Sequence, residues 1–202
     1  EKHNLLFFVS VFNSNKINFL KKNNIDAYKV ASSELSNFDL LHKIANTKKP
    51  IFLSTGMADF ENVLRSVIFL NDLKVKQLVL MHCSSLYPQN IQDMNLNVIN
   101  LYREIFPNIP LGLSDHSKSL MVPSFAVAKG ANIIEKHFTL NKKDSGPDHS
   151  TSLEPSEFLK MINYINIAHK ANGKTIKNLH NTEKKFSRRK GIYFNKNLSK
   201  GS

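Results

Sequence analysis

Two histidines occupy equivalent places in this chain and could bind one metal ion. His116 ends the run Leu-Gly-Leu-Ser-Asp-His, and His137 ends the run Ile-Ile-Glu-Lys-His. Residues at strand ends in a β/α protein converge on one rim of the fold. A pair of imidazoles there holds a divalent ion and leaves coordination positions open, as a catalytic site requires. A hydrogen-bonded structural role is the alternative for each histidine. The two equivalent placements, followed by Gly-Pro-Asp-His at residues 146–149, favour the metal site.

The elements that would position these histidines follow from the hydrophobic pattern. Short runs of Val, Ile, Leu and Phe without polar alternation fit parallel strands covered by helices. We expect strands at residues 5–11, 27–31, 51–54, 77–82, 111–114 and 132–137. Amphipathic patterns separate them, near residues 17–20, 40–44, 60–67, 98–106 and 120–129, and a last helix starts at Pro155. Six βα units in series, without hairpin signals, predict a parallel α/β protein.

Polar residues gather at the carboxyl ends of these expected strands. An open nucleotide-binding sheet would show a glycine-rich phosphate loop, but no such motif occurs and seven glycines leave little room for one. The layout instead predicts a TIM-type (β/α)8 barrel, whose active site draws on many strand ends. Because a closed barrel needs eight βα units and the sequence shows six, we expect two units to precede residue 1.

The periodicity stops after residue 172, so the partial barrel is expected to span residues 1–172. Residues 173–187 are polar and basic, as a linker should be. The basic character continues through Arg188 and Arg189, and Gly-Ile-Tyr-Phe at residues 191–194 predicts a strand. Residues 188–202 are therefore expected to begin a second, β-type domain.

Composition indicates a soluble globular protein. The chain has 202 residues, of which 41% are hydrophobic and 22% charged. No apolar run reaches the roughly 18 residues needed to span a bilayer, and no signal peptide is visible. The single cysteine, Cys83, excludes an internal disulfide framework and fits a reducing compartment. We therefore expect a cytoplasmic protein that does not associate with membranes.

The formal net charge of +12 raises the question of nucleic-acid binding. Lysines greatly outnumber arginines and are scattered, and only residues 174–190 form a dense basic stretch. Nucleic-acid readers usually concentrate arginine and aromatic residues on one face. The sequence therefore predicts no nucleic-acid partner. A non-catalytic basic module that binds polyanions, built on a decayed barrel, is the alternative from another functional class.

Six motifs, taken together, resemble the sialic acid synthase family. They are Ala-Tyr-Lys-Val-Ala-Ser-Ser-Glu at 27–34, Leu-Ser-Thr-Gly-Met at 53–57, His-Cys-Ser-Ser-Leu-Tyr-Pro at 82–88, Gly-Leu-Ser-Asp-His at 112–116, Ile-Glu-Lys-His-Phe-Thr at 134–139 and Gly-Pro-Asp-His at 146–149. Their order and spacing resemble the family over essentially the whole chain. The resemblance implies an enzyme that condenses phosphoenolpyruvate with an N-acetylhexosamine of the N-acetylmannosamine type. The product is a nine-carbon, sialic-acid-like sugar acid, and phosphate is released.

The resemblance also implies the rest of the assembly. It implies a divalent metal ion, namely manganese, whereas histidine ligands alone would equally admit zinc or iron. It implies that the second domain is a small antifreeze-like domain of the SAF type. In the family this domain reaches over the active site of the partner subunit in a homodimer. The chain alone is therefore expected to be poorly active.

The resemblance assigns roles to eleven residues. The metal ligands are His116 and His137. The residues matching phosphoenolpyruvate-binding positions are Ser10, Lys29, Ser32, Ser54, Ser85 and Ser114. The residues matching positions that contact the acceptor sugar, and carry the catalytic roles, are Glu34, Tyr87 and Asp148.

Three residues have a second possible interpretation. Lys29 in a buried strand needs a partner, and an internal salt bridge to Glu34 or Glu135 is the alternative to anion binding. Glu34 could be a helix N-terminal carboxylate. Cys83 is interpreted as a small buried hydrophobe, with a third metal ligand as the alternative.

The sequence also departs from the family pattern. Ser85 stands where some family members have asparagine, and Val-Ser-Val at residues 9–11 replaces a more usual Ser-Thr-Pro. These departures leave the acceptor open. A pseudaminic or legionaminic acid synthase, which uses a diacetamido-trideoxyhexose, is the alternative within the same reaction class.

Overall fold

The structure is a computed structural model that describes residues 5–186, 190–192 and 194–201. The chain divides into two compact units, Glu1–Asn172 and Gly173–Ser202. Each unit is described by itself.

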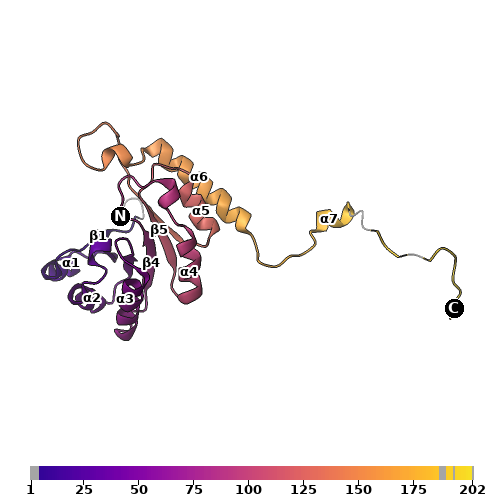
Figure 1. The fold of residues 1–202 in the computed structure, drawn as a ribbon, viewed down its shortest axis with the longest axis horizontal. Coiled ribbons are helices and arrows are strands. Elements are labelled where there is room, and N and C mark those ends of the chain that lie inside the picture. The colour runs from indigo at the N-terminus through magenta and orange to yellow at the C-terminus, as the bar shows by residue number, and fades with distance from the viewer. Residues whose placement is uncertain (1–4, 187–189, 193, 202) are drawn as a thin grey trace. The chain divides into compact units, whose positions relative to one another are not determined.

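The first unit is built on one sheet of six parallel strands. The strands are β1 (Phe8–Ser10), β2 (Ala27–Val30), β3 (Ile51–Ser54), β4 (Leu78–Cys83), β5 (Leu111–Asp115) and β6 (Ile133–Lys136). They pair in sequence order, so β1 and β6 are the two edges of a curled, open half-barrel (Figure 1). The predicted parallel α/β fold is confirmed for these six units, although β1 is shorter than expected. Closure into an eight-unit barrel stays a prediction.

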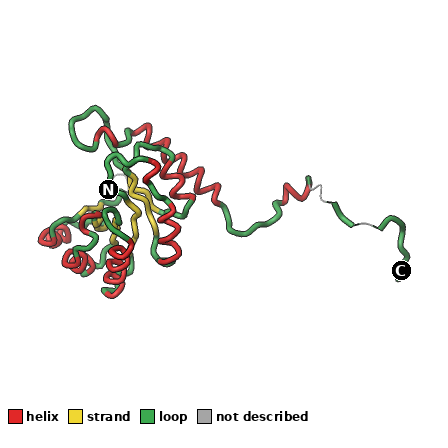
Figure 2. The backbone as a smooth tube through the Cα atoms, in the orientation of Figure 1, coloured by secondary structure: helices red, strands yellow, loops and turns green. Residues whose placement is uncertain are grey.

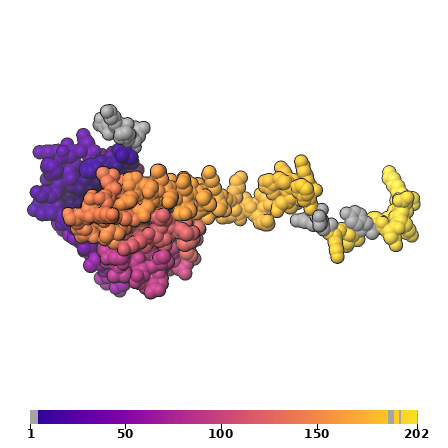
Figure 3. All heavy atoms as spheres, turned by 90° about the horizontal axis from the view of Figure 1, so that it is seen from above, coloured from indigo at the N-terminus to yellow at the C-terminus, as the bar shows by residue number. Residues whose placement is uncertain are grey.

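A helix follows each strand and lies on the outer side of the curled sheet (Figure 2). The helices are α1 (Ile17–Lys22), α2 (Phe38–Ala45), α3 (Phe60–Asp72), α4 (Asn97–Ile105), α5 (Val122–Ala128) and α6 (Pro155–Asn172). Asp59 caps α3 by accepting a hydrogen bond from the Asn62 amide, and α6 begins at Pro155, as predicted. Helix α6 packs on α5 and crosses one face of the unit in the space-filling view (Figure 3).

Alternation along the strands divides their side chains between two faces. The outward-facing apolar residues pack with buried residues of α2 to α5, and this layer is the hydrophobic core. Those strand residues are Tyr28, Val30, Ile51, Leu53, Leu78, Leu80, Leu111 and Leu113. The residues between them face inward. As a result, polar side chains at the carboxyl ends of the strands gather on the inner face.

One inward position requires glycine. A Cβ atom at Gly112 would lie 2.3 Å from the Met81 Sδ and 2.9 Å from the Ile133 carbonyl oxygen. Met81 is fully buried and fills the space that the missing side chain leaves. The close contact between β4 and β5 therefore depends on this glycine.

The second unit differs from its expected form. The stretch expected to be a linker contains a short helix, α7 (Asn181–Lys185), closed by a capping box between His180 and Glu183. The strand expected at residues 191–194 is not formed at the three of those positions that the structure describes, because no described segment pairs with it. Arg188, Arg189 and Tyr193 lie outside the described residues. The assignment of residues 188–202 to a SAF-type domain stays a prediction.

Among the described residues, no helix combines the length and the apolarity that crossing a bilayer requires.

Candidate functional site

A cavity of about 390 Å³ opens at the carboxyl ends of the strands, on the inner face of the sheet. Nine of the eleven predicted residues line it: Ser10, Lys29, Ser32, Ser54, Ser85, Tyr87, Ser114, His116 and His137. They lie in β1, β2, β3 and β5, or in the segments that follow β2, β4, β5 and β6. A larger hollow of about 780 Å³ lies at the opposite ends of β3 to β5, and Lys76 is the one charged residue among its described lining. The chemistry-bearing side chains therefore converge on the smaller cavity.

Lys29 forms an ion pair inside this cavity. Its Nζ donates to the Glu135 Oε1 at 3.0 Å, and the Ser114 Oγ donates to the same oxygen at 3.0 Å. The Lys29 side chain is 14% exposed, whereas that of Glu135 is 42% exposed. The salt bridge considered from the sequence is therefore present. It holds a cation at the cavity wall, where an anion can also reach it.

The serine hydroxyls surround a point of close backbone approach. A Cβ atom at Gly56 would lie 2.6 Å from the Ser85 Oγ and 2.7 Å from the Ser32 Oγ, so only glycine leaves room for both hydroxyls. The Gly56 amide donates to the Ser32 Oγ at 3.0 Å. The Ser54 Oγ is buried and has no hydrogen-bond partner among the described residues. A buried hydroxyl without a partner fits a donor that bonds to a ligand or to water.

The two histidines lie side by side on the cavity wall. Their ring centroids are 5.3 Å apart and their planes are nearly perpendicular, at 82°. The Tyr87 ring lies 4.1 Å from that of His116 and 5.8 Å from that of His137. Partial burial raises the pKa of Tyr87, so its hydroxyl remains protonated at neutral pH and can donate a hydrogen bond. One tyrosine thus covers both imidazoles.

The hydrogen bonds of His116 fit a metal ligand. Its Nδ1 lies 2.7 Å from the Ser84 carbonyl oxygen, so Nδ1 carries the proton and Nε2 keeps a free lone pair. Burial lowers the pKa of His116, which keeps the imidazole neutral at neutral pH. The Cys83 Sγ lies 4.0 Å from Nδ1, and Cys83 also lines the cavity. Its side chain is buried, in agreement with its interpretation as a small buried hydrophobe.

The two histidines have no third protein ligand beside them: among the described residues, no three His, Cys, Asp or Glu side chains lie close enough together to hold an ion. The two imidazoles, with a free Nε2 on His116, fit a site that keeps most of its coordination positions for water and substrate. The donor set is thus compatible with a bound divalent ion.

Glu34 and Asp148 do not line the cavity. The Glu34 carboxylate accepts a hydrogen bond at 2.8 Å from Asn37, the N-cap residue of α2, so the contact at a helix N-terminus considered from the sequence is present. Asp148 lies in the loop between β6 and α6, and its Oδ2 is 3.8 Å from the Nδ1 of His137.

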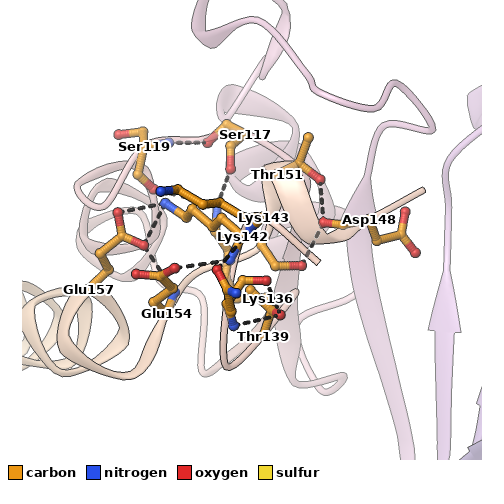
Figure 4. Close-up of polar contacts among 12 residues, drawn as sticks. Ser117, Ser119, Lys136, Thr139, Lys142, Lys143, Asp148, Thr151, Glu154 and Glu157 are labelled. Carbon is orange, nitrogen blue, oxygen red and sulfur yellow. Dashed lines mark hydrogen bonds and ion pairs between the residues drawn. The ribbon is translucent and has the colours of Figure 1, made fainter. Parts of the chain in front are cut away.

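Hydrogen bonds from Lys142 hold the start of the loop that carries Asp148, as Figure 4 shows. The Lys142 Nζ donates to Glu157 at 2.6 Å, and the Lys142 amide donates to Glu154 at 2.9 Å. At the far end of the loop, Thr151 donates to the Asp148 carbonyl at 3.0 Å. These contacts define the conformation of the loop beside His137.

Sequence reasoning considered Glu135 only as a partner of Lys29, and it missed two further charged residues near the histidines. Glu135 lines the cavity, and Lys136 and Asp115 form a buried ion pair behind it. The signal was present in the runs Ser-Asp-His and Glu-Lys-His, because alternation places the first and third residues of each run on one face and the middle residue on the other.

The fold and the site together define an α/β half-barrel protein with a site at the strand ends that combines a lysine, serine hydroxyls and two imidazoles. Residues 1–177 match the NeuB family. The chain therefore belongs to the NeuB family.

The relatives of the chain agree with this assignment. The chain is 35% identical over 205 residues to the N,N'-diacetyllegionaminic acid synthase of Campylobacter jejuni, covering 100% of this chain and 61% of that protein. It is 37% identical over 204 residues to the pseudaminic acid synthase of the same species, covering 100% of this chain and 59% of that protein. The chain thus spans about three fifths of the length of these curated relatives.

A solved structure is similar over most of the chain. It is the N-acetylneuraminic acid (sialic acid) synthetase from Leptospira borgpetersenii in complex with citrate, with a TM-score of 0.86 and 34% identity. The match covers 92% of this chain and 64% of that one. The resemblance predicted from the sequence motifs is confirmed at the level of the family.

Proposed function

We propose that the complete protein condenses phosphoenolpyruvate with an N-acetylated aminosugar, forming a nine-carbon sugar acid and releasing phosphate. The observation that carries this proposal is that one cavity is lined by Lys29, by the Ser54 hydroxyl, which has no described hydrogen-bond partner, and by two imidazoles. Membership of the NeuB family supports it, since the relatives include sialic, pseudaminic and legionaminic acid synthases.

Phosphoenolpyruvate is assigned to the lysine and serine part of the cavity. The Lys29 ammonium supplies the positive charge for the phosphate or the carboxylate, and the hydroxyls of Ser54, Ser32 and Ser85 supply neutral donors. The Ser114 Oγ already donates to Glu135, which holds Lys29 in place. Ser10 stands at the open edge of the same cavity.

The metal and the acceptor are assigned to the histidine end. His116 and His137 would hold a divalent ion, Mn²⁺ by resemblance to the family, which when bound supplies Lewis-acid polarisation of the sugar aldehyde. The Tyr87 hydroxyl and the Asp148 carboxylate lie beside these imidazoles and would orient the acceptor. Glu34, which follows the cavity residue Ser33, would move a proton during carbon–carbon bond formation.

The reaction balances with phosphoenolpyruvate, the open-chain sugar and water as its three reactants. Carbon 3 of phosphoenolpyruvate forms a bond to the aldehyde carbon of the open-chain sugar, and the aldehyde oxygen takes a proton. Water adds at carbon 2, and the phosphate group leaves. The residues of the cavity bind and orient both substrates, which brings the reacting atoms together and raises the rate.

The remaining parts of the enzyme are also proposals. We place this chain in a closed eight-unit barrel, followed by a SAF-type domain, in a cytoplasmic homodimer. The acceptor is an N-acetylmannosamine-type sugar or a diacetamido-trideoxyhexose, as in the legionaminic and pseudaminic acid synthases. The alternative of a non-catalytic polyanion-binding module is not favoured by the family match.

The test is phosphate release from phosphoenolpyruvate by the complete protein, measured with a divalent ion and a panel of acceptor sugars. We expect release only when an N-acetylated aminosugar is present, and the sugar that gives the highest kcat/KM identifies the acceptor. Absence of release with every acceptor, combined with salt-dependent binding to random DNA, would favour the polyanion-binding module.

A further inference from the structure

A buried ion pair lies directly behind the two histidines. Asp115 precedes His116 at the end of β5, and Lys136 precedes His137 at the end of β6. The Lys136 Nζ donates to the Asp115 Oδ2 at 2.7 Å, and the two side chains are 1% and 0% exposed. The pair therefore joins the two strand ends that carry the histidines.

The register of the strands places this pair on the face opposite the cavity. Asp115 and Lys136 are paired across β5 and β6, as are Ser114 and Glu135 one residue earlier. Ser114 and Glu135 line the cavity, and so does His137. Because successive residues alternate between faces, Asp115 and Lys136 point away from the cavity, toward the helix layer.

The Lys136 ammonium also holds the turn that follows His116. It donates to the carbonyl oxygens of Ser117 and Ser119, as Figure 4 shows, and the contact with Ser119 is 3.5 Å long. The Asp115 Oδ1 accepts a hydrogen bond from the Ser117 amide at 2.8 Å. All three donors of the ammonium thus have acceptors, and the backbone on both sides of His116 is fixed by one cation.

Stability alone does not account for this arrangement. Taking two charges out of water costs several kcal/mol for each ion, so an apolar pair of similar volume would serve the core as well or better. What the ion pair and its carbonyl contacts supply is a defined geometry. Metal ligands require such definition, because a site works only when its ligands are held within about 0.5 Å of the productive arrangement.

We propose that Asp115 and Lys136 are positioning residues for a divalent ion bound by His116 and His137. They touch neither the ion nor the substrates, and they set the separation and the orientation of the two imidazoles through the backbone. This inference rests on the proposed function, which supplies the metal ion.

The test compares Mn²⁺ affinity among variants of the complete protein. Asp115→Asn/Lys136→Met removes both charges with little change in volume and leaves no unpaired buried charge. Free Mn²⁺ is measured by electron paramagnetic resonance during a titration, and circular dichroism records the fold. We expect the folded double variant to bind Mn²⁺ about 10- to 100-fold more weakly than the wild type. The matched control is the exposed ion pair on α3: Glu61→Gln/Arg65→Met should keep the wild-type affinity.

The outcomes separate this inference from the proposed function. If His116→Ala abolishes Mn²⁺ binding while the folded double variant keeps wild-type affinity, the positioning role is wrong and the metal site stands. If His116→Ala itself keeps wild-type affinity, the metal site is wrong and the inference fails with it. If the double variant does not fold, Asp115→Glu decides, because it keeps the charge of the buried pair and changes its geometry by one methylene group. We expect its Mn²⁺ affinity to fall by about threefold or more, and an unchanged affinity overturns the proposal.

Discussion

Lys29 provides a quantitative test of the assignment of phosphoenolpyruvate to the cavity. Lys29→Met keeps the length of the side chain and removes its charge. The ammonium is largely buried and pairs with one carboxylate, Glu135, at 3.0 Å. A hydrogen bond between a charged donor and an anion contributes about 1.5–3 kcal/mol, which is about 10- to 150-fold in affinity. We therefore expect the KM for phosphoenolpyruvate to rise by about that factor.

The same change should have little effect on stability. Glu135 is 42% exposed, so its carboxylate can regain water when the lysine is removed. The loss of a partly exposed ion pair costs about 1 kcal/mol or less. Urea unfolding should therefore show a small shift of the midpoint, while substrate affinity changes strongly. This difference separates a binding role from a structural one.

The assay is the steady-state KM for phosphoenolpyruvate at saturating metal and acceptor, together with calorimetric binding of phosphoenolpyruvate alone. The matched control is Lys43→Met, the same substitution in an exposed pair with Asp39 on α2, 2.9 Å apart. The control should leave the KM unchanged. The reasoning is refuted if Lys29→Met leaves the KM within twofold of the wild type, or if both variants change it equally.

Three further substitutions test the packing around the site. Lys136→Met alone leaves the Asp115 carboxylate buried without a counter-charge, so we expect about 3–5 kcal/mol of destabilisation in urea unfolding, and a loss below about 1 kcal/mol would contradict it. Burial lowers the pKa of His82, so the unfolded chain takes up a proton first as the pH falls. The contribution of His82 to the free energy of unfolding is then fully present above about pH 6.5, and it decreases toward the folded pKa by at most about 1.4 kcal/mol per pH unit. His82→Gln should flatten this slope, and an unchanged slope would show that His82 does not cause it. Gly112→Ala places a methyl group 2.3 Å from the Met81 Sδ and should cost about 1–3 kcal/mol in thermal unfolding, whereas a wild-type Tm would show that the methionine moves freely.

The strands and the histidine pair were predictable because their signals are local. Uninterrupted apolar runs mark strands buried by helices, and a polar residue at the end of each run marks the rim. His116 and His137 follow directly from this rule, and the structure places both on the same cavity wall. Their role as metal ligands stays a prediction.

The partners of each side chain could not be predicted in the same way. The sequence left the partner of Lys29 open between an anion, Glu34 and Glu135, because the contact with Glu135 spans 106 positions and depends on the strand register, which no local pattern specifies. For Glu34 the sequence offered both an acceptor-contacting role and a carboxylate at a helix N-terminus; the hydrogen bond from Asn37 shows the second contact, and the first stays a prediction. The strand expected at residues 191–194 had local β-propensity without a described partner, and pairing decides whether a strand forms.

The central claim is that His116 and His137 hold a divalent ion that the condensation requires. The most direct measurement is phosphate release from phosphoenolpyruvate by the complete protein after removal of metal with a chelator and addition of Mn²⁺. We predict no release without Mn²⁺, release with Mn²⁺ and the acceptor sugar together, and none from His116→Ala or His137→Ala, although both variants fold. Full turnover in the chelated protein, or in both histidine variants, would contradict the account.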